Sequence, residues 1–284
     1  MSIESTNRRQ FLAGVLGGSL GVLAQSIVQA KAGAPKVEKG FVRLFNGKNL
    51  QGWHTNVQKV FHGSGGSWKV EQGAITGEQY PPGSGNGGIL MTDHQYGDFE
   101  LLLEAAPDWG VDSGIFLRTN SRGECFQVYV DYHDHGNVGW LSTETPTGQK
   151  RMIIRPFNFF GKLNEQGILT EFTTKPDERD IAWKPDYLVY SATPEAWLSA
   201  WKIGQWNTLR IRCVGKYPQI TTWINQTKIA EFDGTKCPQP NYDKDKVFQN
   251  LGRKGAIGLQ VHGGKSAWAE GAKCRWRNIR IKPL

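Results

Sequence analysis

The sequence has few cysteines, and none of them lie close together. The chain has 284 residues but only four cysteines, Cys125, Cys213, Cys237 and Cys274. Zinc fingers and zinc ribbons need cysteines in closely spaced Cys-x-x-Cys pairs, so a structural zinc site of this type is excluded. Four cysteines allow three disulfide pairings, and their positions select none of them. The oxidising compartment inferred below leaves room for one disulfide.

Long apolar runs, repeats and blocks of one charge are also missing. No apolar run in the body of the chain reaches the ~20 residues of a transmembrane helix. Lys and Arg exceed Asp and Glu by 34 to 26, but the two signs are mixed along the chain. A nucleic-acid partner is therefore not expected, because such proteins carry a basic stripe or a recognisable motif. An acidic glycan remains a second interpretation of the positive charge.

Glycine and aromatic residues are abundant, at 35 Gly, 11 Trp, 8 Tyr and 13 Phe. Six short segments read as strands: 99–104, 115–118, 126–131, 209–214, 257–262 and 276–282. Three of them, 126–131, 209–214 and 257–262, alternate apolar and polar residues, which is typical of strands with one buried face. Many short strands with turns between them predict a β-sandwich or jelly roll.

Two further segments carry local predictions. Residues 221–230 read as a hairpin with Asn225 and Gln226 at its turn. Residues 143–200 hold several prolines, many charges and little alternation. They predict long loops at the rim of the sandwich, either as functional lids or as surface excursions without a role.

The N-terminus carries a targeting pattern. Arg8 and Arg9 are followed by Phe11 and Leu12, and then by a mildly apolar, Gly- and Ala-rich stretch over residues 13–24. This is the layout of a twin-arginine export signal. The alternative is a membrane anchor, for which the stretch is short and rich in glycine.

The export signal sets the domain boundaries. Residues 1–30 form the predicted signal, with cleavage after Ala30, and residues 31–40 form a linker. Residues 41–284 are long enough for one sandwich domain. We therefore expect a bacterial protein that is periplasmic or secreted, without a membrane span in its mature chain.

Five sets of motifs, in order along the chain, resemble the 3-keto-disaccharide hydrolase domain family. They are FVRLFNGKNLQGW (41–53), GDFEL (97–101), DSGIFLR (112–118), WNT with TWIN (206–208 and 222–225), and IGLQVHG with WRNIRI (257–263 and 276–281). The resemblance covers residues 41–284 and implies a concanavalin A-like jelly-roll sandwich of two antiparallel sheets. It also implies a glycoside hydrolase or lyase that acts on 3-keto glycosides.

The sequence departs from the family pattern at four positions. Asp112 stands for the usual Asn, Cys125 for a Glu, Thr222 for a common His, and Val261 for an Asp.

The implied reaction depends on the acidity beside a ketone. A ketone at C3 of the sugar acidifies the C2 proton, a base removes it, and the resulting enolate expels the glycosidic oxygen from C1. Hydration of the product completes a net hydrolysis. Such a route needs a base, a group that stabilises the enolate and a proton donor.

The candidate catalytic residues each have a second interpretation. His262 is either base or acid, or it caps the following glycine turn. Arg118 either stabilises an enolate or pairs with Glu104 on a neighbouring strand. Asp112 and Asp131 are possible bases or metal ligands, and Asp112 before Ser-Gly could instead form a turn.

Substrate-binding and metal-binding candidates come from side chains that face away from the predicted core. The substrate-binding candidates are Glu104, Gln127, Tyr129, Gln260, Trp109 and Trp140, and Trp53 and Trp268 are further possible stacking residues. The alternatives are satisfied sheet residues and buried tryptophans. No cofactor is required, but Asp131, His133 and His135 are candidate ligands for a divalent metal, or else part of a solvated loop.

Two other functions remain open alongside the 3-keto enzyme. A non-catalytic carbohydrate-binding module would share the fold and the aromatic residues. An ordinary glycosidase would need two carboxyl groups across a sugar, drawn from Glu100, Glu104, Asp112 and Asp131. In each case the partner is a carbohydrate, and the oligomeric state is not indicated.

Overall fold

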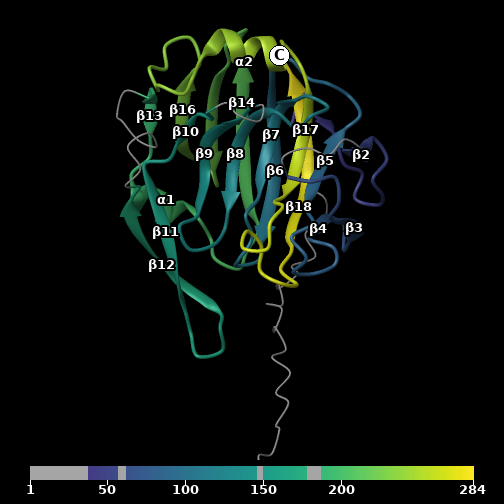
Figure 1. Ribbon diagram of the computed structural model, residues 1–284, viewed down its shortest axis with the longest axis vertical. Helices are drawn as coiled ribbons and strands as arrows, with labels where there is room; N and C mark the ends of the chain where they lie inside the picture. The colour runs from purple at the N-terminus through teal and green to yellow at the C-terminus, as the bar shows by residue number, and fades with distance from the viewer. Residues whose placement is uncertain (1–37, 57–61, 146–149, 178–186) are drawn as a thin grey trace, which may run out of the picture.

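The fold is an all-β jelly-roll sandwich, as the sequence predicts. The computed structural model describes residues 38–56, 62–145, 150–177 and 187–284. Within these ranges the backbone forms two large antiparallel sheets, a separate two-stranded hairpin and two short helices (Figure 1). The predicted export signal lies outside the described residues. No helix among the described residues is long and apolar enough to cross a membrane.

Sheet A has strand order β13-β16-β15-β14-β6-β18-β4-β3, and β1 pairs with β18. Its strands are β1 (Val42–Arg43), β3 (Ser67–Glu71), β4 (Ala74–Glu78), β6 (Phe99–Pro107), β13 (Tyr190–Ser191), β14 (Asn207–Val214), β15 (Gln219–Ile224), β16 (Thr227–Asp233) and β18 (Cys274–Pro283). Strand β14 buries Leu209, Ile211 and Cys213 and leaves Arg210 and Arg212 partly exposed. One face of sheet A therefore packs on the core and the other faces outward.

Sheet B has strand order β10-β9-β8-β7-β17-β5-β2. Its strands are β2 (Trp53–Thr55), β5 (Gly88–Thr92), β7 (Gly114–Thr119), β8 (Cys125–Asp131), β9 (Asn137–Glu144), β10 (Ile153–Ile154) and β17 (Ala256–Val261). Every residue of β7, β8, β9 and β17 is buried. Both faces of sheet B are thus covered, and the face directed away from sheet A is called its outer face below.

The segment 143–200 differs from the expected loops. Its described part contains β10, the hairpin of β11 (Phe157–Leu163) and β12 (Leu169–Pro176), β13, and helix α1 (Pro194–Ala200). The hairpin extends past the end of the sheets (Figure 1). Because β10 and β13 have two residues each and α1 has seven, these elements are too short to show a period. The second helix is α2 (Lys244–Leu251), and the side chain of Asp243 caps its N-terminus.

Two local predictions have clear outcomes. The 221–230 hairpin is confirmed as β15 and β16, and Asn225 and Gln226 take positive φ angles of 45° and 74° at the turn. All four cysteines are free, and Cys237 alone among them is not fully buried. The structure therefore contains none of the three possible disulfide pairings.

Candidate functional site

Buried amide side chains mark the outer face of sheet B. Gln127 on β8 donates from Nε2 to Oε1 of Gln260 on β17 at 2.9 Å, and Ser142 Oγ on β9 donates to Gln127 Oε1 at 3.0 Å. Nε2 of Gln260 is buried without a hydrogen-bond partner among the described residues. A buried donor without a partner is costly, so this amide is a candidate for binding a substrate oxygen.

Gly114 on β7 makes room for this amide chain. A Cβ atom at this position would lie 2.4 Å from Nε2 of Gln127. Any larger residue would displace the Gln127 side chain, which crosses over β7 to reach Gln260. The sequence placed Gln127 and Gln260 among the substrate-binding residues, and the structure brings them together.

Two histidines lie beside each other at the end of this face. The ring centroids of His62 and His262 are 4.5 Å apart. Nε2 of His62 lies 3.5 Å from a carboxylate oxygen of Glu144, which also pairs with Arg151 at 2.9 Å. Burial alone would raise the pKa of Glu144, but the hydrogen bond and charge of His62 and the charge of Arg151 outweigh it and lower the pKa. Glu144 is therefore an ionised partner for the histidine pair.

The tautomer of His262 follows from its contact with the chain. Nδ1 lies 2.5 Å from the carbonyl oxygen of Gly263, which can only accept a hydrogen bond, so Nδ1 carries the proton. Nε2 then holds a lone pair, and it makes no hydrogen bond within the described residues. Burial, together with the charge of His62, lowers the pKa of His262, against the opposing charge of Asp112. A neutral imidazole with a free Nε2 can act as a base near neutral pH.

Two aspartates and a third histidine form a group near His262. Asp112, Asp131 and His133 offer ligand atoms that all lie within 4.8 Å of one another. Burial, and then the charge of Asp112, raise the pKa of Asp131. The pKa of Asp112 is lowered despite burial, because His133 and His262 favour its charged form. One carboxyl group thus keeps its proton while its neighbour is ionised.

The third metal candidate from the sequence, His135, does not join this group. His135 has a φ angle of 64°, and its ring lies 4.6 Å from that of Phe160 on the hairpin. The left-handed backbone turns the chain between β8 and β9, so His133 and His135 diverge. The structure replaces His135 by Asp112 in the candidate ligand set.

Arg155 completes the group from the segment between β10 and β11. Its Nη1 atom lies 3.9 Å from Oδ2 of Asp131, and its guanidinium carbon lies 5.6 Å from the centroid of the Tyr129 ring. Burial raises the pKa of Tyr129, so the phenol stays neutral. Tyr129 was a predicted substrate-binding residue and lies at this group.

Four members of this cluster were missed by the sequence reasoning: His62, Glu144, Arg151 and Arg155. The last three fall in the segment interpreted as loops. The only available signal was the parity of Ser142 and Glu144, which places both on the face that carries Gln127.

Arg118 and Glu104 lie elsewhere. Arg118 is fully buried and binds Asp98 at 2.9 Å and the carbonyl oxygens of Gly97 and Gly215 at 3.0 and 2.9 Å. Its φ angle of 52° breaks the alternation that placed it beside Phe116. Its ion-pair partner is not Glu104, which contacts Arg277 and Asn278 on sheet A. The structure therefore does not bring either residue to the cluster.

The tryptophans serve packing. Trp109 is half-buried against Tyr132, and Trp140 is fully buried with its indole nitrogen donating to Ser191 Oγ at 3.1 Å. Trp53 and Trp268 are also buried and donate to backbone carbonyls. None of these four side chains forms an open stacking surface.

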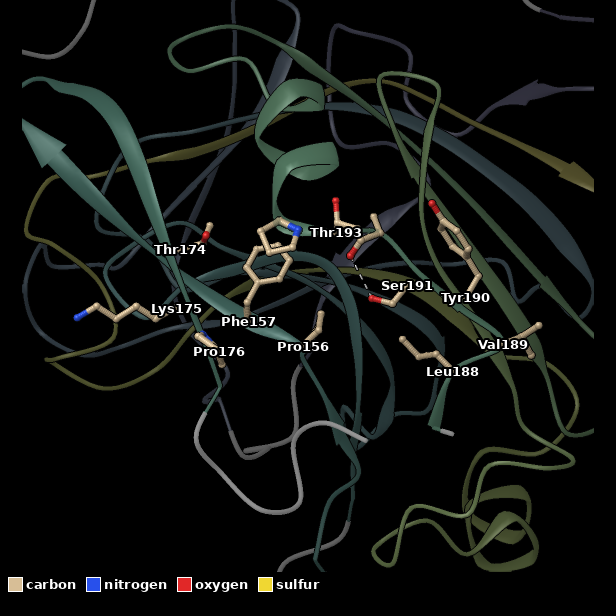
Figure 2. Close-up of a pocket in the computed structure, with 12 residues that line it drawn as sticks. Pro156, Phe157, Thr174, Lys175, Pro176, Leu188, Val189, Tyr190, Ser191 and Thr193 are labelled. Carbon is tan, nitrogen blue, oxygen red and sulfur yellow. Dashed lines mark hydrogen bonds between the residues drawn. The ribbon is translucent and has the colours of Figure 1, made fainter. Parts of the chain in front are cut away.

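A separate cavity of about 410 Å³ lies between the hairpin and β13 (Figure 2). Its wall is mostly apolar and includes Phe157, Leu188 and Tyr190. Two of the hydroxyl groups in the wall have protein partners, because Ser191 Oγ donates to the carbonyl oxygen of Ala192 and Thr193 Oγ1 accepts from the backbone N–H of Ala196. Among the described residues, the lining includes none of the histidines and carboxylates of the cluster on sheet B.

No curated protein matches the chain. A solved structure titled "Putative glycosyl hydrolase" from Parabacteroides distasonis is 20% identical, with a TM-score of 0.47 and coverage of 86% of this chain and 99% of that one. A Bacillus licheniformis β-glucanase is 12% identical, with a TM-score of 0.46 and coverage of 86% and 97%.

A carbohydrate-binding module, CBM66 from Bacillus subtilis, is 11% identical, with a TM-score of 0.40 and coverage of 82% of this chain and 97% of that one. The family model described as the 3-keto-alpha-glucoside-1,2-lyase-like domain matches residues 40–282. The chain therefore belongs to the 3-keto-alpha-glucoside-1,2-lyase-like domain family.

Proposed function

We propose that this protein is an enzyme that cleaves 3-keto glycosides by proton abstraction, elimination and hydration. Membership of the family indicates a carbohydrate-related function. The observation that carries the finer proposal is the pair His62 and His262, whose rings lie 4.5 Å apart. Both Asp112 and Glu144 act electrostatically on His262, and Glu144 also lies 3.5 Å from His62.

His262 serves as the base in this proposal. Its free Nε2 takes the C2 proton, and the electrons of that C–H bond form the enolate of the C3 ketone. The enolate then collapses to a C1–C2 double bond as the C1–O bond breaks. The leaving oxygen takes a proton from a ring nitrogen of His62, which lies beside the ionised Glu144, and the water that adds next returns a proton to His62. Water adds across the double bond, placing hydroxyl on C1 and hydrogen on C2.

Arg155 takes the enolate-stabilising role that the sequence gave to Arg118. Its Nη atoms make no hydrogen bond within the described residues, and its side chain is 11% exposed. A partly desolvated guanidinium with free donors binds a developing oxyanion strongly. Gln260, with its unpartnered Nε2, would hold a neighbouring hydroxyl.

Asp112, Asp131 and His133 fit a divalent cation. Oδ1 of Asp131 and Nε2 of His133 are buried without hydrogen-bond partners among the described residues. Carboxylate and imidazole ligands suit divalent transition metals. When bound, such an ion would polarise the keto oxygen. Because Asp131 must lose its proton to ligate, binding would weaken as the pH falls.

The ordinary glycosidase fits the cluster less well. The ligand oxygens of Asp112 and Asp131 lie within 4.8 Å of each other. This separation is shorter than the ~5–10 Å between the two carboxyl groups of an ordinary glycosidase. A binding module would not require the pair of His62 and His262.

The test compares 3-keto glucosides with their unoxidised parent sugars in deuterated water, with and without chelator. We expect cleavage of the keto form alone, with one deuterium at C2 of the product. Direct hydrolysis would leave C2 undeuterated and would refute the elimination route. The C2 hydrogen of the ketone product can also exchange with deuterated water on its own. A control with pure product under the same conditions measures this exchange. Binding of both sugars without cleavage would favour the module.

Two histidine variants sharpen this test. His262→Ala should lower turnover by about 10²–10⁴-fold, the usual contribution of a general base. His135→Ala is the matched control, because His135 is exposed and contacts Phe160 instead of the cluster. Full activity of the His262 variant would remove this residue from the mechanism.

A further inference from the structure

Arg155 lies between two carboxylates but is anchored by only one. Its Nε donates to Oδ2 of Asp177 at 3.0 Å, whereas its Nη1 is 3.9 Å from Oδ2 of Asp131. The second distance is too long for a hydrogen bond. The Asp177 side chain is 2% exposed, so the bonded pair is shielded from solvent. One edge of the guanidinium is therefore fixed, and within the described ranges the Nη atoms make no hydrogen bond.

We propose that Asp177 is a positioning residue, which holds the Arg155 guanidinium so that its Nη atoms meet the keto oxygen of the substrate. This inference rests on the function proposed above. A guanidinium is planar, and its donors point in fixed directions. The Nε bond to Asp177 and the contact with the Tyr129 ring together define the plane of the guanidinium. Without Asp177, the long side chain of Arg155 gains rotamers that direct the Nη atoms elsewhere.

The backbone connects this pair to the hairpin. Arg155 stands two residues before β11 begins, and Asp177 follows β12 directly. The backbone N–H of Asp177 donates to the carbonyl oxygen of Pro156 at 3.4 Å. Both ends of the hairpin therefore meet at the Arg155–Asp177 pair. Through this pair, the hairpin, which lies outside the two sheets, orients the Arg155 side chain next to Asp131 of β8.

The central variant is Asp177→Asn, which keeps the size of the side chain and the backbone bond. We expect kcat to fall by about 10–100-fold, as for a small misplacement of a reacting group, with a smaller change in KM. Asp177→Glu keeps the charge and should recover part of the loss. Glu171→Gln is the matched control, because this β12 carboxylate pairs with Lys162 at 2.9 Å but is 61% exposed.

A double-mutant cycle separates positioning from scaffolding. In an Arg155→Ala background, Asp177→Asn should cause no further loss of kcat, because Asp177 acts through Arg155. Equal losses of kcat in both backgrounds would overturn the proposal, and so would wild-type kcat in Asp177→Asn. If Asp177→Asn does not fold, the same cycle with Asp177→Glu decides. Absence of turnover in the wild-type protein would instead refute the proposed function, and this inference with it.

Discussion

Identical side chains acquire different chemistry from their neighbours in this protein. Asp112 and Asp131 lie in one group, yet the pKa of Asp112 is lowered while that of Asp131 is raised. Asp112 faces His133 and His262, whereas Asp131 is fully buried beside the negative charge of Asp112. Environments that separate the pKa values of two carboxyl groups are typical of sites that both donate and accept protons.

Asp131 should cost stability at neutral pH. Its folded-state pKa lies above the ordinary value of 3.8, so its favourable contribution is present in acid and is lost as the pH rises through the folded-state pKa. Asp131→Asn removes that loss. We expect its Tm in a mildly alkaline, chelator-containing buffer to exceed that of the wild type by about 2–4 °C, corresponding to ~1 kcal/mol.

The gain should shrink in acidic buffer, where the wild-type carboxyl group is protonated as well. Thermal unfolding at both pH values provides the measurement. A Tm below that of the wild type in alkaline buffer would show that the carboxylate form stabilises the fold. Asp131→Asn should lose activity whether its Tm rises or falls, because sites often gain function at the expense of stability.

At the scale of elements, strand parity predicted some faces and failed at one. It placed Gln127 and Tyr129 on one face of β8 and Gln260 on the matching face of β17, and the hydrogen bond between Gln127 and Gln260 agrees. It failed for Arg118, because a positive φ angle and a register shift between β17 and β7 reverse the side chain. Alternation carries no information about such a bulge.

Arg118 instead connects the segment at Gly97 and Asp98 to Gly215 by hydrogen bonds. Its removal should destabilise the fold. Arg118→Ala leaves Asp98 and the carbonyl oxygens of Gly97 and Gly215 without this donor. We expect a loss of about 3–5 kcal/mol in the free energy of unfolding, the usual cost of breaking a buried ion pair. Urea denaturation measures it.

A nearby arginine provides the control for this prediction. Arg122 pairs with Glu124 at 2.9 Å, but its side chain is 59% exposed. Arg122→Ala should cost less than about 1 kcal/mol. Equal losses for the two variants would contradict the distinction between them.

At the scale of the whole molecule, the fold was more predictable than the site. Strands and family motifs are local patterns, so a sandwich over residues 41–284 could be inferred directly. The site combines His62 with Glu144 and Arg155, which are more than 80 residues away in sequence, and with residues of β8 and β17, which lie close together through the strand order of sheet B. No local pattern encodes that order, and only Asp112, Asp131, Gln127, Tyr129, Gln260, His133 and His262 were found beforehand.

The location of the protein also belongs to this scale, and we propose from the predicted export signal that the protein is periplasmic or secreted. Replacing Arg8 and Arg9 by Lys should retain the protein in the cytoplasm, because the paired arginines are the feature that the export system reads. Cell fractionation and the intact mass of the exported chain provide the measurement. The mature protein should begin at Lys31. Unchanged export of the double variant would contradict the assignment.

The free cysteines have a consequence for how this protein is made. Cys125, Cys213 and Cys274 are enclosed in the packed interior, and Cys237 is also unpaired. A domain without disulfides owes none of its stability to an oxidising environment. Its folding needs neither thiol oxidases nor disulfide isomerases. The free cysteines are therefore compatible with the proposed twin-arginine export, in which the chain folds in the reducing cytoplasm and is transported in its folded form.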